Sequence, residues 1–332
     1  MMKKAFCLVM ATVFCFVLVG CSGESAGGLD KVRVCEVTHS VFYAPQYAAM
    51  QLGLFEKYGI EIELTTGEGA DKVMAAVLSN GADIGFAGPE AAVYVYNEGK
   101  QDYAQVFAQV TKRDGSFLIG RTPQPDFDWQ SLRGKVVLPG RKGGMPYMAL
   151  EYVLKQSGLD IDKDLTLDNS IQFSLMTAAF INGTGDYVTA FEPVASTLVQ
   201  NGQGYIVASV GQASGEIPYT AYFAKKSYLE QNSDLVLRFT KALYEGQQWV
   251  ESHSAADIAQ LIAPAFADTD VALLTAALQS YKDADAWAST PLLGQEAFDR
   301  LQTVMRSAGE LQQTAPYDKV VNTQFAIDAI AG

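Results

Sequence analysis

The segment from Thr38 to Tyr47 holds the first group of side chains that could bind a small molecule. Ser40 supplies a hydroxyl group, and Phe42 and Tyr43 are adjacent aromatic residues. Aromatic rings can stack on a planar solute while a hydroxyl group bonds to its edge. Because Phe42 alone could equally be a core residue, Tyr43 is the stronger prediction for contact with a solute.

A second segment ends a short apolar run at Gly88 and continues through Pro89 to Glu90. Glycine lets a ligand approach the backbone closely. The same residues also form an ordinary helix start, since proline suits the first turn and a carboxylate complements the helix dipole. Pro89 lacks an N–H group and Glu90 repels anions, so this turn favours a solute that donates hydrogen bonds.

Gly144 and Tyr147 belong to a third segment, which is rich in glycine and also contains Arg141 and Lys142. Glycine-rich loops before helices can bind phosphate and other anions. The glycine and lysine spacing of a phosphate-binding loop is absent, and so is the dinucleotide-binding pattern. We therefore predict a flexible wall of a cleft here, and not a nucleotide site.

Phe191 and Glu192 lie in a fourth segment, at the end of an apolar run and before Pro193. A carboxylate at this place could accept paired hydrogen bonds from an amine or an amidine-like edge. Alternatively, Glu192 could be a first-turn residue that complements a helix dipole. If Glu90 and Glu192 face one cleft, that cleft favours cationic or donor-rich solutes over inorganic anions.

The sequence lacks the usual patterns of an enzyme. Its one Gly-x-Ser-x-Gly match, Gly23 to Gly27, lies in the short polar segment after Cys21 and not at a strand-to-helix elbow; there is no His-Glu-x-x-His motif, and the only histidines are His39 and His253. Cys35 lies in an apolar run, where a buried thiol is expected rather than a reactive one. We expect no catalytic residues, no metal site and no cofactor.

Short β-branched runs alternate with longer amphipathic runs from Lys31 onward, which predicts parallel strands covered by helices. A second block of this kind spans roughly residues 135–208, and the chain beyond about residue 225 is mostly helical. Two α/β blocks predict two lobes with two crossings between them. We place lobe 1 at 31–118 and 210–332, and lobe 2 at 119–209. In such sheets, ligands bind at loops beyond the carboxyl ends of strands.

Residues 1–20 have the composition of a lipoprotein signal peptide. Lys3 and Lys4 precede an apolar run that ends in Leu18-Val19-Gly20-Cys21, where the cysteine can carry a lipid. In an ordinary secretory peptide, Cys21 would instead be incidental. Residues 21–30 are predicted to form a flexible tether. These features predict an extracytoplasmic protein, at the cell surface or in the periplasm, that contacts the membrane through its lipid anchor only.

The net charge of the 332-residue chain is −13 at pH 7, and no basic run stands out. We therefore expect no nucleic-acid partner. The length and the 49% of hydrophobic residues allow two domains with large cores. We expect a monomer.

Several segments resemble the NMT1/THI5-like and SsuA-like binding proteins of ABC importers. They are Phe42 to Ala49 with Gly53 to Ile60, Asp83 to Phe86, and Gly183 to Pro193. The resemblance implies a two-lobed periplasmic binding protein type II fold, with mixed sheets flanked by helices and a helical C-terminal tail. By analogy, the cleft positions are Ser40 to Tyr43, Gly88 to Glu90, Gly143 to Tyr147, Phe191 and Glu192.

The same resemblance implies a function. The chain would capture a small organic solute, aromatic, heterocyclic or amine-bearing, and deliver it to an ABC permease and its ATPase. Three alternatives stay open: a binding protein for sulfonate or nitrate, a THI5-like enzyme of pyrimidine biosynthesis, and an extracellular sensor lipoprotein. Because one fold hosts many functions, it cannot choose the solute.

Overall fold

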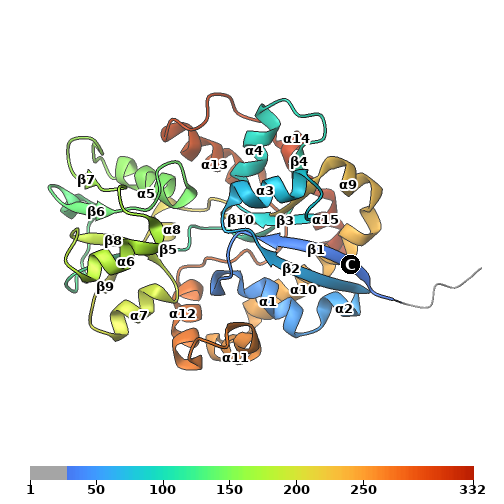
Figure 1. Ribbon diagram of the computed structural model, residues 1–332, viewed down its shortest axis with the longest axis horizontal. Helices are drawn as coiled ribbons and strands as arrows, with labels where there is room; N and C mark the ends of the chain where they lie inside the picture. Colours follow the sequence, from blue (N-terminus) through green and yellow to red (C-terminus); the bar gives the residue numbers. More distant parts are fainter. Residues whose placement is uncertain (1–27) are drawn as a thin grey trace, which may run out of the picture.

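The structure, a computed structural model, describes residues 28–332. The predicted signal peptide and Cys21 lie outside these residues. The described chain forms two five-stranded sheets that lie side by side along the long axis of the molecule (Figure 1). Helices flank both sheets, which confirms the predicted α/β class.

The first sheet has the strand order β2-β1-β3-β10-β4. β1 runs parallel to β2 and β3, whereas β10 is antiparallel to β3 and β4, so the sheet is mixed. Every residue of β3 and β4 is buried, as expected for strands that are covered on both faces. The strands are β1 (Asp30–Glu36), β2 (Ile60–Thr66), β3 (Ile84–Ala87), β4 (Ala104–Thr111) and β10 (Thr220–Lys225).

The second sheet has the order β7-β6-β8-β5-β9 and is also mixed. β6 is parallel to β7 and β8, and β5 is antiparallel to β8 and β9. Its strands are β5 (Ser116–Gly120), β6 (Val136–Leu138), β7 (Thr166–Leu167), β8 (Tyr187–Phe191) and β9 (Tyr205–Ser209). Its helices are η2 (Trp129–Leu132), α5 (Met145–Gln156), α6 (Phe173–Ile181), α7 (Val194–Gln200) and α8 (Val210–Ser214).

The remaining helices belong to the first sheet and the C-terminal tail. Before the first crossing lie η1 (Val41–Tyr43), α1 (Ala44–Gln51), α2 (Leu54–Lys57), α3 (Ala70–Leu78) and α4 (Glu90–Asn97). After β10 come α9 (Lys226–Gln231), α10 (Ser233–Ser252), α11 (Ala255–Ile262), η3 (Ala263–Phe266), α12 (Val271–Asp283), α13 (Gln295–Ser307), α14 (Tyr317–Val320) and α15 (Gln324–Ala331). The tail is helical, as predicted. Within residues 28–332, no helix is both long and apolar enough to cross a membrane.

The chain passes twice between the sheets. Residues 112–115 join β4 to β5, and residues 215–219 join α8 to β10. The tail also links the two halves, because α12 contacts α7 and η1 while α13 contacts α5 and α4. The crossings lie close to the predicted lobe boundaries at residues 118 and 209, and the division into lobes stays a prediction.

Candidate functional site

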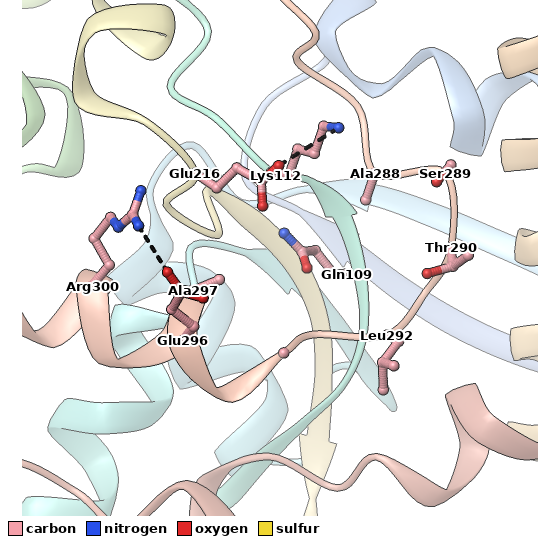
Figure 2. A pocket seen from close by; sticks show the side chains of 11 residues that line it. Gln109, Lys112, Glu216, Ala288, Ser289, Thr290, Leu292, Glu296, Ala297 and Arg300 are labelled. Carbon is pink, nitrogen blue, oxygen red and sulfur yellow. Dashed lines mark hydrogen bonds and ion pairs between the residues drawn. The ribbon is translucent and has the colours of Figure 1, made fainter.

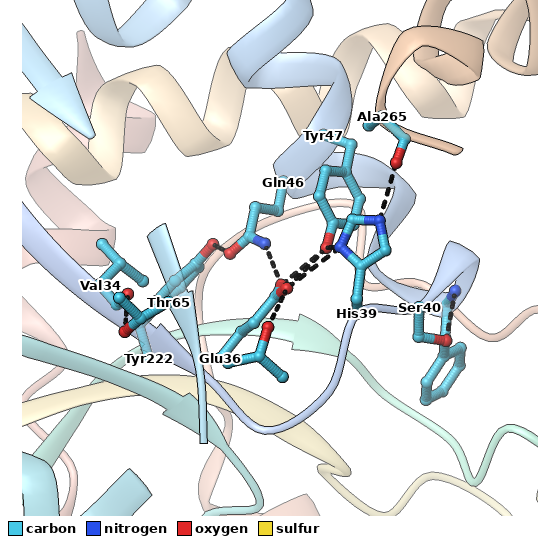
Figure 3. Close-up of polar contacts among 11 residues, drawn as sticks. Val34, Glu36, His39, Ser40, Gln46, Tyr47, Thr65, Tyr222 and Ala265 are labelled. Carbon is cyan, nitrogen blue, oxygen red and sulfur yellow. Dashed lines mark hydrogen bonds and ion pairs between the residues drawn. The ribbon is translucent and has the colours of Figure 1, made fainter. Parts of the chain in front are cut away.

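The loop after β1 is held in place by a buried hydrogen-bond network around Glu36 (Figure 3). The Glu36 carboxylate accepts hydrogen bonds from the Gln46 amide at 2.8 Å and from the Tyr47 hydroxyl at 2.7 Å. His39 lies 3.3 Å from the same carboxylate, and its Nε2 lies 2.8 Å from the carbonyl oxygen of Ala265. Glu36 is therefore a satisfied buried acid, and its network fixes the backbone that carries the predicted aromatic residues.

Ser40 and Phe42 occupy the start of this fixed loop. The Ser40 hydroxyl accepts a hydrogen bond from the backbone N–H of Phe42 at 3.2 Å and so caps η1. Phe42 and Tyr43 are both buried, with exposed fractions of 2% and 3%. Ser40 thus has a local structural partner, and both rings point into the interior of the protein.

Phe42 is the centre of an aromatic cluster that joins the two sheets. Its ring centroid lies 5.8 Å from that of Tyr219, 4.8 Å from that of Tyr281 and 6.4 Å from that of Phe191. Phe191 ends β8 in the second sheet, whereas Phe42 follows β1 in the first. We call these residues, together with Tyr43, the Phe42 cluster. Two predicted site segments that are far apart in the sequence thus meet here.

The Glu90 side chain turns back over the preceding turn. A Cβ atom placed on Gly88 would lie 2.0 Å from Oε2 of Glu90, so only a glycine leaves room for this carboxylate. Oε2 is buried and has no hydrogen-bond partner among the described residues. Burial raises the pKa of Glu90 to about 7. Glu90 therefore differs from an ordinary first-turn acid, which would extend into water.

Glu192 is engaged within its own turn. Its carboxylate accepts hydrogen bonds from the backbone N–H and the hydroxyl of Ser196, both at 2.9 Å. Its own N–H donates to the Tyr281 hydroxyl at 3.2 Å. The residue is buried and satisfies the first turn of α7, which is the alternative role considered from the sequence. Its contact with a solute stays a prediction.

The glycine-rich segment lies at the start of α5. Gly144 is the N-cap residue of this helix, and a Cβ atom on its neighbour Gly143 would lie 3.3 Å from Oε1 of Glu310. Tyr147 is buried, and burial is the main cause that raises the pKa of its hydroxyl, followed by nearby Glu151. Its ring therefore sits beside an acid of its own helix. Arg141 and Lys142 are exposed.

Sequence reasoning missed two polar residues at this site: Asp114, which lies near the Phe42 cluster, and Tyr219, which belongs to it. Asp114 is 1% exposed, and its Oδ1 accepts hydrogen bonds from the Ser116 N–H and hydroxyl at 2.6 and 2.5 Å. Its Oδ2 faces the Tyr219 hydroxyl, but neither atom makes a hydrogen bond of good geometry with any residue in 28–332. Burial raises the pKa of Asp114 to about 6. An acid three residues before Phe117, where an apolar run begins, was the available signal for Asp114.

The cations that precede Asp114 in the sequence point elsewhere. Lys112 pairs with Asp285 at 2.9 Å, and Arg113 pairs with Asp285 at 3.2 Å. Across residues 28–332, no ion pair reaches Glu90, Asp114 or Glu192. The carboxylates near the Phe42 cluster are therefore not neutralised by protein cations.

Comparisons with known proteins agree with this architecture. The model of the NMT1-like family matches residues 37–263, most of the chain. This chain belongs to the NMT1-like family. Membership confirms the resemblance found in the sequence. The protein described as putative binding protein YtlA of Bacillus subtilis (strain 168) is 44% identical over 325 residues, which cover 98% of this chain and 97% of that protein.

Solved structures share the fold of this NMT1-like protein. The alkanesulfonate-binding protein SsuA from Xanthomonas axonopodis pv. citri, bound to MOPS, matches with a TM-score of 0.69 and 17% identity, over 90% of this chain and 100% of that one. The periplasmic nitrate-binding protein NrtA from Synechocystis PCC 6803 matches with a TM-score of 0.66 and 16% identity, over 91% of this chain and 89% of that one. The predicted periplasmic binding protein fold is thereby confirmed.

A cavity of about 580 Å³ lies elsewhere in this NMT1-like protein, beside the two crossings and the start of α13 (Figure 2). The cations in its lining are paired: Lys112 lies 3.8 Å from Glu216, and Arg300 lies 3.2 Å from Glu296. None of the predicted site residues lines this cavity, so it is a space distinct from the Phe42 cluster.

Proposed function

We propose that this protein is the solute-binding component of an ABC importer. It captures a small organic solute between the two sheets and delivers it to a permease driven by an ATPase. The observation that carries the proposal is the contact of Phe42, which follows β1 of the first sheet, with Phe191, which ends β8 of the second; their ring centroids lie 6.4 Å apart. Loops beyond strand ends are the usual ligand sites of open α/β sheets.

Binding would favour a closed arrangement of the two halves. A solute that contacts both sheets stabilises the state in which they approach, and a permease can recognise that state. Tyr43 and the half-buried Phe191 are the side chains that would stack on an aromatic or heterocyclic solute. The names of SsuA and NrtA as binding proteins, and that of YtlA as a putative one, support this role.

The solute class has a second candidate. SsuA and NrtA are named for alkanesulfonate and nitrate, so a sulfonate or nitrate solute follows from the fold relatives. The unneutralised carboxylates beside the Phe42 cluster favour the amine-bearing or heterocyclic solute instead. We further propose a binding role without catalysis. The thiol of Cys35 is buried, and the side chains of His39 and Tyr47 are both engaged by the buried carboxylate of Glu36.

We also propose that the protein is a monomer anchored outside the cytoplasm by a lipid on Cys21. The support for the lipid anchor is the sequence of residues 1–21 alone. A Cys21→Ser variant should leave the membrane fraction and appear in the soluble extracytoplasmic fraction. Retention of this variant in the membrane fraction would contradict the lipid anchor without touching the solute-binding proposal.

A thermal-shift screen tests the solute-binding function. The chain from Ser22 onward would be heated with pyrimidines, flavins, sulfonates, nitrate, amines and amino acids. A solute that binds only the folded state raises the melting temperature in a saturable way. The shift should weaken in a Tyr43→Ala variant and persist in an Ile327→Ala variant, since Ile327 is exposed on α15. If no solute in the whole screen stabilises the protein, the function is refuted.

A further inference from the structure

Within residues 28–332, three buried oxygen atoms in and near the Phe42 cluster make no hydrogen bond of good geometry. They are Oε2 of Glu90, Oδ2 of Asp114 and the hydroxyl oxygen of Tyr219. Asp114 is 1% exposed and Tyr219 is 9% exposed, so water hardly reaches either residue. Because folded proteins satisfy nearly all buried polar atoms, three such atoms in one region point to a missing partner.

The three residues come from three different segments of the chain, and both crossings contact Phe42. Glu90 follows β3, Asp114 lies on the first crossing, and Tyr219 ends the second crossing. The Tyr219 ring packs on Phe42 at 5.8 Å, and a Cβ atom on Gly115 would lie 2.7 Å from the Phe42 ring. Burial raises the pKa of the Tyr219 hydroxyl, and the Asp114 carboxyl group, which lies within hydrogen-bonding reach of it, raises that pKa further, as does Glu90.

The two carboxyl groups of this region are negative when ionised, and no cationic side chain within residues 28–332 pairs with them. Asp114 and Glu90 take part in no ion pair within the described part of the chain, and Lys112 and Arg113 bind Asp285 instead. An anionic solute would add a third negative charge between two buried carboxyl groups. A cation with several N–H groups would instead give each orphan oxygen a donor.

We propose that Glu90, Asp114 and Tyr219 form the polar end of the solute site and bind a cationic nitrogen group, such as a protonated amine or an amidinium. The inference rests on the proposed solute-binding function and narrows its substrate class. It separates this protein from relatives that are named for sulfonate or nitrate. Tyr43 and Phe191 would then contact the apolar part of the same solute.

Binding of such a cation should release protons. Tyr43, Tyr94 and Tyr219 face Glu90, and Tyr219 and Tyr281 face Asp114; burial keeps all four hydroxyl groups protonated below pH 9. The two carboxyl groups, with pKa values of about 7 and 6, are therefore the groups that titrate. A cation favours their ionised forms, so its affinity rises from pH 5.5 to pH 8, whereas the affinity of an anion falls.

The test uses pairs of probes that share one ring and differ in charge: benzamidine and benzylamine against benzenesulfonate and benzoate. The chain from Ser22 onward would be studied by thermal shift and by calorimetric titration in phosphate and Tris buffers, which reports proton release. We expect saturable stabilisation by the cations only, with protons released. Glu90→Gln and Asp114→Asn should each weaken binding by roughly ten-fold or more.

Matched variants separate site effects from folding effects. Glu151→Gln removes a buried carboxylate that pairs with Lys155 on α5, and it should keep the affinity of the parent protein. Tyr219→Phe removes only the hydroxyl group and should weaken binding less than Glu90→Gln. The proposal is wrong if neither cationic probe binds, if the anions bind instead, or if Glu90→Gln and Asp114→Asn bind the cations unchanged. A saturable sulfonate or nitrate shift would overturn it and leave the solute-binding function standing.

Discussion

The carboxylate of Glu90 lies over the Cα atom of Gly88, where a Cβ atom would come within 2.0 Å of Oε2. This contact orients the Glu90 side chain toward the interior. The backbone of Gly88 does not require glycine for its dihedral angles, since it is absent from the positive-φ residues. Glycine is therefore needed at this position for the space that it leaves.

We expect Gly88→Ala to displace the Glu90 side chain while leaving the fold intact. Because the clashing atom is the end of a flexible side chain, the loss of stability should be small, about 1 kcal/mol. Solute affinity should fall about ten-fold, and the substitution should have no further effect in a Glu90→Ala background.

Calorimetric titration of the four proteins of this double-mutant cycle measures the coupling between Gly88 and Glu90. Additive losses would show that Gly88 acts independently of Glu90. Gly294→Ala, at a site with open space, is the control.

The solute-free protein should lose stability as the pH rises from about 4.5 to about 7. Burial raises the pKa of Glu90 to about 7 and that of Asp114 to about 6, above the ordinary values of 4.5 and 3.8. The folded state thus holds protons that the unfolded state has released, so its free energy of unfolding decreases over this window. The two groups together account for a loss of up to roughly 5 kcal/mol. Urea unfolding at pH 5 and pH 8 measures it.

Glu90→Gln should flatten this pH dependence, because an amide does not titrate. The same variant should be more stable than the parent protein at pH 8, where the parent holds a buried charge. An unchanged pH dependence would place the titrating groups elsewhere in the protein. Glu296→Gln, an exposed acid on α13, is the control and should leave the curve as it was.

Glu192→Ala should destabilise α7 even without solute. The substitution removes the acceptor of two hydrogen bonds from Ser196, and loss of such a cap costs about 1–2 kcal/mol. If Glu192 only stabilises the first turn of α7, the solute affinity of the folded variant should change less than three-fold. A large loss of affinity with little loss of stability would instead assign it to the solute. Urea unfolding and calorimetric titration separate the two.

Tyr47→Phe should loosen the loop that carries the Phe42 cluster. The hydroxyl group donates to the buried Glu36 carboxylate at 2.7 Å, and a buried hydrogen bond to a charged group contributes about 1.5–3 kcal/mol. We expect a loss of stability of this size in urea unfolding. Tyr58→Phe, which removes a hydrogen bond to the half-exposed Glu245, should cost less. Equal losses in the two variants would contradict a special role of the Glu36 network.

Local signals in the sequence were enough to predict the architecture. Alternation of β-branched and amphipathic runs reflects burial on two faces of a sheet, and residues near in sequence carry that pattern. The loops at Ser40 to Tyr43, at Gly88 to Glu90 and at Phe191 were found for the same reason, because each follows a strand. The pairing of Phe42 with Phe191 was expected only as a shared cleft, and the structure places their rings in one cluster.

The tertiary structure alone decided which polar groups lack partners. Asp114 and Tyr219 lie on two separate crossings, so no local pattern could bring them together beside Glu90. The sequence allowed two roles for Glu192, and the hydrogen bonds from Ser196 favour the helix cap. Burial and hydrogen bonding depend on residues distant in sequence. For this reason the sequence by itself determined the fold class, the family resemblance and the loops that build the site, whereas only the packed structure decided which of their acids stay unsatisfied.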